Sequence, residues 1–90
     1  MRVGRRYVVS GRVQGVGFRA FTQTAAVREG VRGWVENRPD GSVAIGAEAE
    51  PEALERFERH IRRGPPGARV DHVDAAAVAV DERNIHFTIR

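Results

Sequence analysis

The residues best suited to chemistry lie between positions 11 and 19, in the run Gly11-Arg12-Val13-Gln14-Gly15-Val16-Gly17-Phe18-Arg19. Glycines adopt backbone conformations that other residues avoid, and they let a ligand approach the N–H groups closely. A turn of this kind at the head of a helix presents unpaired N–H donors to an anion. An arginine there adds a planar, permanently charged fork that suits a phosphate. The run therefore predicts a phosphate cradle made of Gln14, Gly15, Val16, Gly17, Phe18 and Arg19.

The composition narrows the class of protein. Ninety residues, 41% hydrophobic and 30% charged, are typical of one soluble globular domain spanning residues 1–90. The net charge of +3 comes from fifteen arginines and no lysine against twelve acids. Because these arginines are scattered along the chain, they indicate a solvated surface more than a nucleic-acid-binding face.

Several classes of site and location are excluded or disfavoured by what the chain lacks. There is no cysteine, which excludes disulfides, thiolate metal sites and a cysteine nucleophile. The three histidines are far apart and show no ligand spacing, so we expect no metal site. No long apolar run indicates a signal peptide or a membrane span, so we expect a cytoplasmic protein.

The hydrophobic pattern predicts two helices among short strands. Apolar spacing and the end signals Gly30, Pro51 and Gly64 favour helices over Phe18–Glu29 and Pro51–Arg63. Alternation predicts five strands, which are Arg5–Val13, Gly33–Asn37, Ser42–Ala49, one within Val70–Val80, and Ile85–Ile89 with Ile85, Phe87 and Ile89 on one face. We expect Phe18, Phe21 and Trp34 to be core residues.

The order of these elements indicates the fold. The turn Pro39-Asp40-Gly41 joins its two strands so tightly that they must be antiparallel. The β-α-β-β-α-β order with an added terminal strand is that of an α+β, ferredoxin-like sandwich, an antiparallel sheet with two helices on one face. In this fold the end of the first strand and the end of the strand bearing Asn37 can share one edge of the sheet.

Two other functions of the glycine loop are disfavoured. The pattern Gly15-x-Gly17-x-x-Ala20, with Glu36 further along, matches a dinucleotide-binding fingerprint. That site needs a parallel sheet, whereas the Pro39-Asp40-Gly41 hairpin is antiparallel. An RNA-binding domain shares the strand order but stacks bases on aromatic residues of its central strands. Only Tyr7 is present there, so we expect no nucleic-acid partner.

Three stretches together closely resemble the acylphosphatase family. They are the run 11–19, then Gly33-Trp34-Val35-Glu36-Asn37-Arg38-Pro39-Asp40-Gly41-Ser42-Val43, then Gly64-Pro65-Pro66-Gly67-Ala68-Arg69-Val70. The resemblance implies a ferredoxin-like fold and hydrolysis of the carboxyl–phosphate bond of acyl phosphates, with no metal or other cofactor. It implies that Arg19 binds the phosphate and that Asn37 orients the attacking water. The expected partners are a small acyl phosphate and inorganic phosphate, and we expect a monomer.

These roles fit the chemistry of the residues, although each has a plainer interpretation. An acyl phosphate releases a carboxylate, which needs little protonation, so no strong general acid is required. Asn37 is no base at neutral pH, but its amide can hold a water molecule; taken alone, it is typical of a turn. Thr22, one helical turn after Phe18, is a candidate supporting residue. The alternative function is a non-catalytic module that binds acyl or carbamoyl phosphate, as at the front of larger proteins; the free-standing chain of 90 residues favours the enzyme.

Overall fold

Strand β1 runs through the sheet and pairs with a neighbour on each side. The computed structural model describes residues 1–90. β1 (Val3–Arg12) pairs antiparallel with β3 (Val43–Ala49) and with β4 (Arg69–Val78). β2 (Arg32–Asn37) pairs antiparallel with β3, and β5 (Phe87–Ile89) pairs with β2. The strand order is β4-β1-β3-β2-β5, which confirms the ferredoxin-like arrangement.

The hairpin between β2 and β3 forms at the predicted turn. The Arg38 N–H donates to the Ser42 carbonyl at 2.8 Å, and the Gly41 N–H donates to the Arg38 carbonyl at 3.1 Å. Gly41 takes a φ of 93°, a conformation that glycine adopts without steric penalty. The first four strands are antiparallel, as expected. The added strand β5 differs, because its pairing with β2 is parallel and makes the five-stranded sheet mixed.

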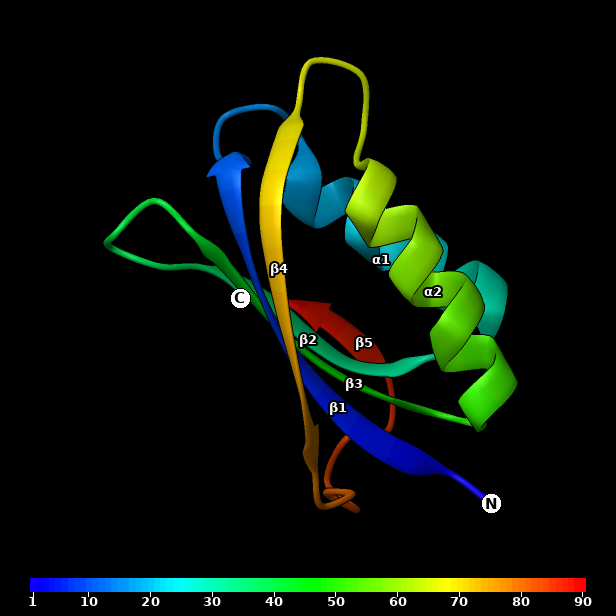
Figure 1. Ribbon diagram of the computed structural model, residues 1–90. Helices are drawn as coiled ribbons and strands as arrows, with labels where there is room; N and C mark the ends of the chain where they lie inside the picture. Colours follow the sequence, from blue (N-terminus) through cyan, green and yellow to red (C-terminus); the bar gives the residue numbers. More distant parts are fainter.

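Both helices lie on one face of the sheet, as Figure 1 shows. They are α1 (Phe18–Glu29) and α2 (Pro51–Arg63), with the predicted bounds. On α2 the side chains of Leu54, Phe57 and Ile61 form a buried stripe. Neither helix has the length and apolar character needed to cross a bilayer.

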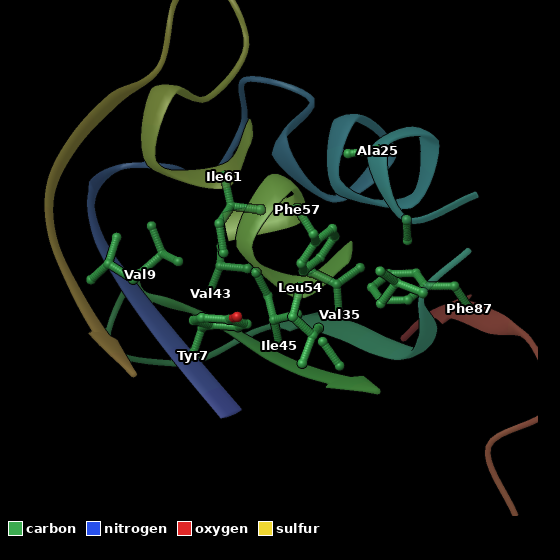
Figure 2. Packing of buried hydrophobic residues seen from close by; sticks show 14 of the residues in the cluster. Tyr7, Val9, Ala25, Val35, Val43, Ile45, Leu54, Phe57, Ile61 and Phe87 are labelled. Carbon is green, nitrogen blue, oxygen red and sulfur yellow. The ribbon is translucent and has the colours of Figure 1, made fainter. Parts of the chain in front are cut away.

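The core fills the space between the helices and the sheet (Figure 2). Apolar side chains from β1, β2, β3 and β5 point toward α2, and the Phe57 ring of α2 lies among them. The Phe57 ring centroid is 6.2 Å from that of Tyr7 and 6.0 Å from that of Phe87. This packing holds the short strand β5 against the rest of the sheet.

Three predictions of burial differ from the structure. Trp34 is half-buried on the open face of the sheet, because Val35 takes the inward position on β2. Its ring lies over Gly46, and the guanidinium carbons of Arg90 and Arg6 are 4.5 and 5.9 Å from the ring centroid. Phe21 is only half-buried. Ile85 precedes β5 and is 64% exposed, so its predicted place on the strand was wrong.

Candidate active site

The loop between β1 and α1 has the backbone geometry of an anion cradle. Gly15 and Gly17 have φ values of 74° and 77°, while no residue other than glycine has a positive φ. The sign of φ therefore alternates along residues 15–18. Successive residues that alternate in this way turn their N–H groups toward a common point, which makes a concave anion-binding nest.

The donors of this cradle have no partner within the protein. No backbone acceptor takes a hydrogen bond from the N–H groups of Gly15, Val16 or Gly17. Phe18 and Arg19 open α1, where N–H groups have no helical acceptor. A Cβ placed on Gly15 or Gly17 would meet no atom within 4 Å, so the space beside the loop is open. The helix dipole adds partial positive charge at this point.

Two of the predicted cradle residues support the loop without lining its cavity. The Gln14 side chain donates through Nε2 to the main-chain oxygens of Arg38 and Ser42, at 2.8 and 2.9 Å. It thereby ties the loop to the β2–β3 hairpin. Val16 packs against the core. Neither is among the residues that line the cavity at this end of the sheet, although their backbones form part of the loop.

Arg19 is held by the last residue of the chain. Its Nη1 donates to the main-chain oxygen of Arg90 at 2.9 Å, and the Arg90 N–H donates to the Val35 carbonyl at 2.8 Å. The guanidinium is thus oriented from the β5 side of the sheet. A guanidinium carries five N–H donors, so most of them stay available to a ligand. The sequence shows nothing of this contact, which joins residues 71 positions apart.

Asn37 comes to the same cavity from the end of β2. It pairs with Val43 and lies on the helix side of the sheet, because it is two residues beyond the buried Val35 and side chains on a strand alternate between the two faces. Its side chain is exposed and makes no hydrogen bond to the protein. The cavity has a volume of about 230 Å³ and is lined by Val13, Gly15, Gly17, Phe18, Arg19, Ala20, Asn37 and Ile89. The structure therefore brings Arg19 and Asn37 together at the cradle.

The charge in this cavity is positive. Arg19 is the only ionisable side chain among the eight lining residues. The nearest turn carries an acid, Asp40, whose Oδ1 accepts hydrogen bonds from the Ser42 Oγ–H at 2.6 Å and the Ser42 N–H at 2.9 Å. These bonds to Ser42 hold the pKa of Asp40 below its usual value of 3.8. Asp40 therefore stabilises its own turn and does not line the cavity.

The other residues considered from the sequence do not line the site. Thr22 is buried, and its Oγ1 donates to the Phe18 carbonyl at 2.8 Å, which reinforces the first turn of α1. No group of three or more histidine, aspartate or glutamate side chains is arranged to hold a metal ion. The apolar lining residues Val13, Ala20 and Ile89 were not predicted as site residues.

This arrangement can bind a phosphate group and place a water molecule beside it. The converging N–H groups and the guanidinium stabilise negative oxygens, and the Asn37 amide offers both a donor and an acceptor. The apolar lining residues form a third, uncharged part of the cavity.

Comparison with known proteins agrees with this geometry. The family model described as Acylphosphatase matches residues 5–89. An acylphosphatase of Nitratidesulfovibrio vulgaris is 54% identical over 69 residues, which cover 77% of this chain and 69% of that protein. The crystal structure of acylphosphatase from Bacillus subtilis superposes with a TM-score of 0.94 at 39% identity and covers 98% of both chains. Full-length HypF in its phosphate- and nucleotide-bound form matches with a TM-score of 0.89 at 30% identity, over 12% of its length. The chain therefore belongs to the acylphosphatase family.

Proposed function

We propose that this chain hydrolyses acyl phosphates without a metal ion, with Arg19 and the cradle amides holding the phosphoryl group and Asn37 orienting the attacking water. One observation carries this proposal. Arg19, in the first turn of α1, and Asn37, at the end of β2, line a single cavity beside N–H groups that no protein acceptor uses.

Phosphate binding follows from the positive charge of the cavity. In phosphoryl transfer the charge is spread over the peripheral oxygens, so catalysis consists mainly of positioning and electrostatic stabilisation. The amides of residues 15–19 supply dipoles that are already oriented in the folded protein. The bond from Arg19 to the Arg90 oxygen fixes the guanidinium before the substrate arrives. In this proposal the guanidinium supplies the charge neutralisation that a metal ion gives in other phosphatases.

The hydrolytic step requires little acid or base chemistry. The water held by Asn37 forms a bond to phosphorus while the bond between phosphorus and the carboxyl oxygen breaks. The electron pair leaves with the carboxylate, and the proton of the water passes to an oxygen of the phosphate. Because a carboxylate is a good leaving group, no general acid is needed, and the charge on the substrate's own phosphate makes it a sufficient proton acceptor.

Hydrolysis of benzoyl phosphate by the purified chain tests the roles of both residues. We expect Arg19→Gln to lower kcat/KM by about 1,000-fold and to weaken inhibition by inorganic phosphate. Asn37→Ala should lower kcat by about 100-fold or more and leave phosphate inhibition close to that of the parent. Turnover should persist in EDTA. Arg28→Gln, on an exposed position of the same helix, is the matched control and should keep parental activity.

The outcome also separates a second candidate function. This chain is similar to one segment of the larger protein HypF, whose full-length structure holds phosphate and nucleotide, so the second candidate is a module that binds a phosphate compound without hydrolysing it. If the parent chain binds phosphate but does not hydrolyse several acyl phosphates, the binding module replaces the enzyme. Parental activity in both Arg19→Gln and Asn37→Ala would show that the residue assignment is wrong.

A further inference from the structure

We propose that Ile89 and Ala20 form an apolar shelf that receives the acyl group, so that the site selects substrates with an apolar acyl group. This inference rests on the proposed function, because it assigns the second half of the same substrate. It concerns the apolar residues that line the cavity beside the phosphate cradle.

Ile89 is an unusual residue for its position. It is 41% exposed, although it belongs to a strand whose neighbour Phe87 is only 6% exposed. Val13 and Phe18, which also line the cavity, are 1% and 2% exposed and so form its closed floor. Ala20 is exposed on the first turn of α1. Ile89 and Ala20 are therefore the apolar lining residues that a ligand can still cover.

The register of the sheet places this shelf beside the phosphate cradle. Ile89 pairs with Val35 on β2, and Asn37 lies two residues further along that strand, on the same side. The residue after Ile89 is Arg90, whose main-chain oxygen accepts the hydrogen bond from Arg19. Ala20 directly follows Arg19 on α1. Ile89 is thus the sequence neighbour of the residue that orients the guanidinium, and Ala20 is the neighbour of the residue that carries it.

The chemistry of the cavity defines which acyl groups fit. Apart from Arg19 and Asn37, every lining residue is glycine or apolar, so no further side chain is available to pair with a polar or charged acyl group. Burying such a group without a partner is costly, whereas covering the exposed apolar side chain is favourable. The phosphoryl end is fixed by charge, and the acyl end is selected by apolar contact.

The test compares two substrates that share the phosphoryl group and differ in the acyl group, benzoyl phosphate and acetyl phosphate. For each variant, kcat/KM for benzoyl phosphate is divided by kcat/KM for acetyl phosphate. This ratio is then divided by the same ratio for the parent chain, which cancels the intrinsic reactivity of the two substrates. We expect Ile89→Ala to lower this ratio by about five-fold, since several apolar carbons of the shelf are removed. Ile89→Thr keeps the branched shape that suits a strand and should lower the ratio by about two- to three-fold.

Two controls separate substrate contact from a structural role. Ile85→Ala removes another exposed isoleucine just before β5, outside this cavity, and should leave the ratio at the parental value. Inhibition by inorganic phosphate, which lacks an acyl group, should be unchanged in Ile89→Thr. A merely structural role of Ile89 would lower both kcat/KM values equally.

The possible outcomes are distinct. A lower ratio in both Ile89 variants supports the shelf. An unchanged ratio, with both substrates hydrolysed, overturns the shelf and leaves the proposed hydrolysis standing. If the parent chain hydrolyses neither benzoyl phosphate nor acetyl phosphate, the proposed function is overturned and the shelf with it.

Discussion

Glycines serve opposite purposes in the cradle and in the sheet. Gly17 in the cradle and Gly33 on β2 both have positive φ, 77° and 142°. A Cβ on Gly17 would meet no atom within 4 Å, whereas one on Gly33 would come within 1.8 Å of the Gly46 carbonyl oxygen. The first glycine leaves space that a ligand can use, and the second leaves space that the protein itself fills. Glycine alone therefore does not mark a binding site; at Gly17 it is accompanied by open space and by neighbouring N–H groups that no protein acceptor uses.

The backbone polar groups of the cradle and of the sheet differ in the same way: those of the sheet are paired within the protein, and those of the cradle are not. The Gly33 N–H donates to the His86 carbonyl at 2.8 Å, and the Gly33 carbonyl accepts from Thr88 Oγ1 at 3.4 Å. The N–H groups of residues 15–17 have no such partner. Since unpaired donors in a folded protein are usually solvated or bound to ligands, the cradle leaves its donors free for solvent or a ligand, while the sheet uses its own for stability.

The largest effect should come from filling the crowded position. We expect Gly33→Ala to lower the free energy of unfolding by about 4 kcal/mol, the sum of backbone strain and overpacking against Gly46. A domain of this size is stable by only about 5–15 kcal/mol, so the variant should be partly unfolded at moderate temperature. Urea denaturation followed by circular dichroism measures the change. A loss no larger than that of Gly30→Ala would show that crowding at Gly33 is unimportant.

Gly17→Ala should affect activity more than stability. Its φ of 77° is unfavourable for alanine, so we expect a loss of about 1–2 kcal/mol in stability. If alanine relaxes toward a negative φ, the cradle amides turn away from the phosphate, and kcat/KM should fall by about 100-fold. The measurements are urea denaturation and hydrolysis of benzoyl phosphate.

Gly30 offers a matched control for this substitution. It ends the same helix with a φ of 71°, and a Cβ there would also meet no atom within 4 Å. Gly30→Ala should therefore cost about the same stability, 1–2 kcal/mol, and leave specific activity unchanged. Equal losses of activity in the two variants would contradict a special role for the cradle backbone.

Most of the fold was predictable because its signals are local. Both helices were predicted with their observed bounds, since Gly30, Pro51 and Gly64 mark their ends, and the turn before Gly41 identified the β2–β3 hairpin. The side of the sheet to which Trp34 points was missed: the charged Arg32 and Glu36 share its face and indicate the open side, whereas the size of its apolar ring favoured the core. The parallel pairing of β5 was not predictable either, since no turn motif joins it to its partner.

The candidate site was likewise predictable only in part. Arg19 and Asn37 each lie within a short motif that the sequence shows directly, and the structure places both on one cavity. The contact between Arg19 and Arg90, and the place of Ile89 in the cavity, depend on the register of β5 against β2. Register over so long a separation is decided by tertiary packing, here of Phe87 against Phe57, which local pattern does not report.

The smallest predicted effect concerns the exposed turn beside the cavity, where polar bonds replace packing. Asp40 accepts two hydrogen bonds from Ser42, which lower its pKa in the folded protein. A carboxyl with a depressed folded-state pKa contributes stability above its unfolded pKa and loses it as pH falls through the folded value. Asp40→Asn should therefore be less stable than the parent at pH 7, and the difference should shrink as the pH falls below about 4.

Urea denaturation of both proteins between pH 7 and pH 2.5 measures this difference. Ser42→Ala removes the hydroxyl donor and keeps the N–H, so the pH-dependent part of the stability should be reduced but not abolished. A difference between the parent and Asp40→Asn that stays constant with pH would mean that the charge of Asp40 does not stabilise the turn. The turn would then be held by its backbone bonds and by Gln14 alone.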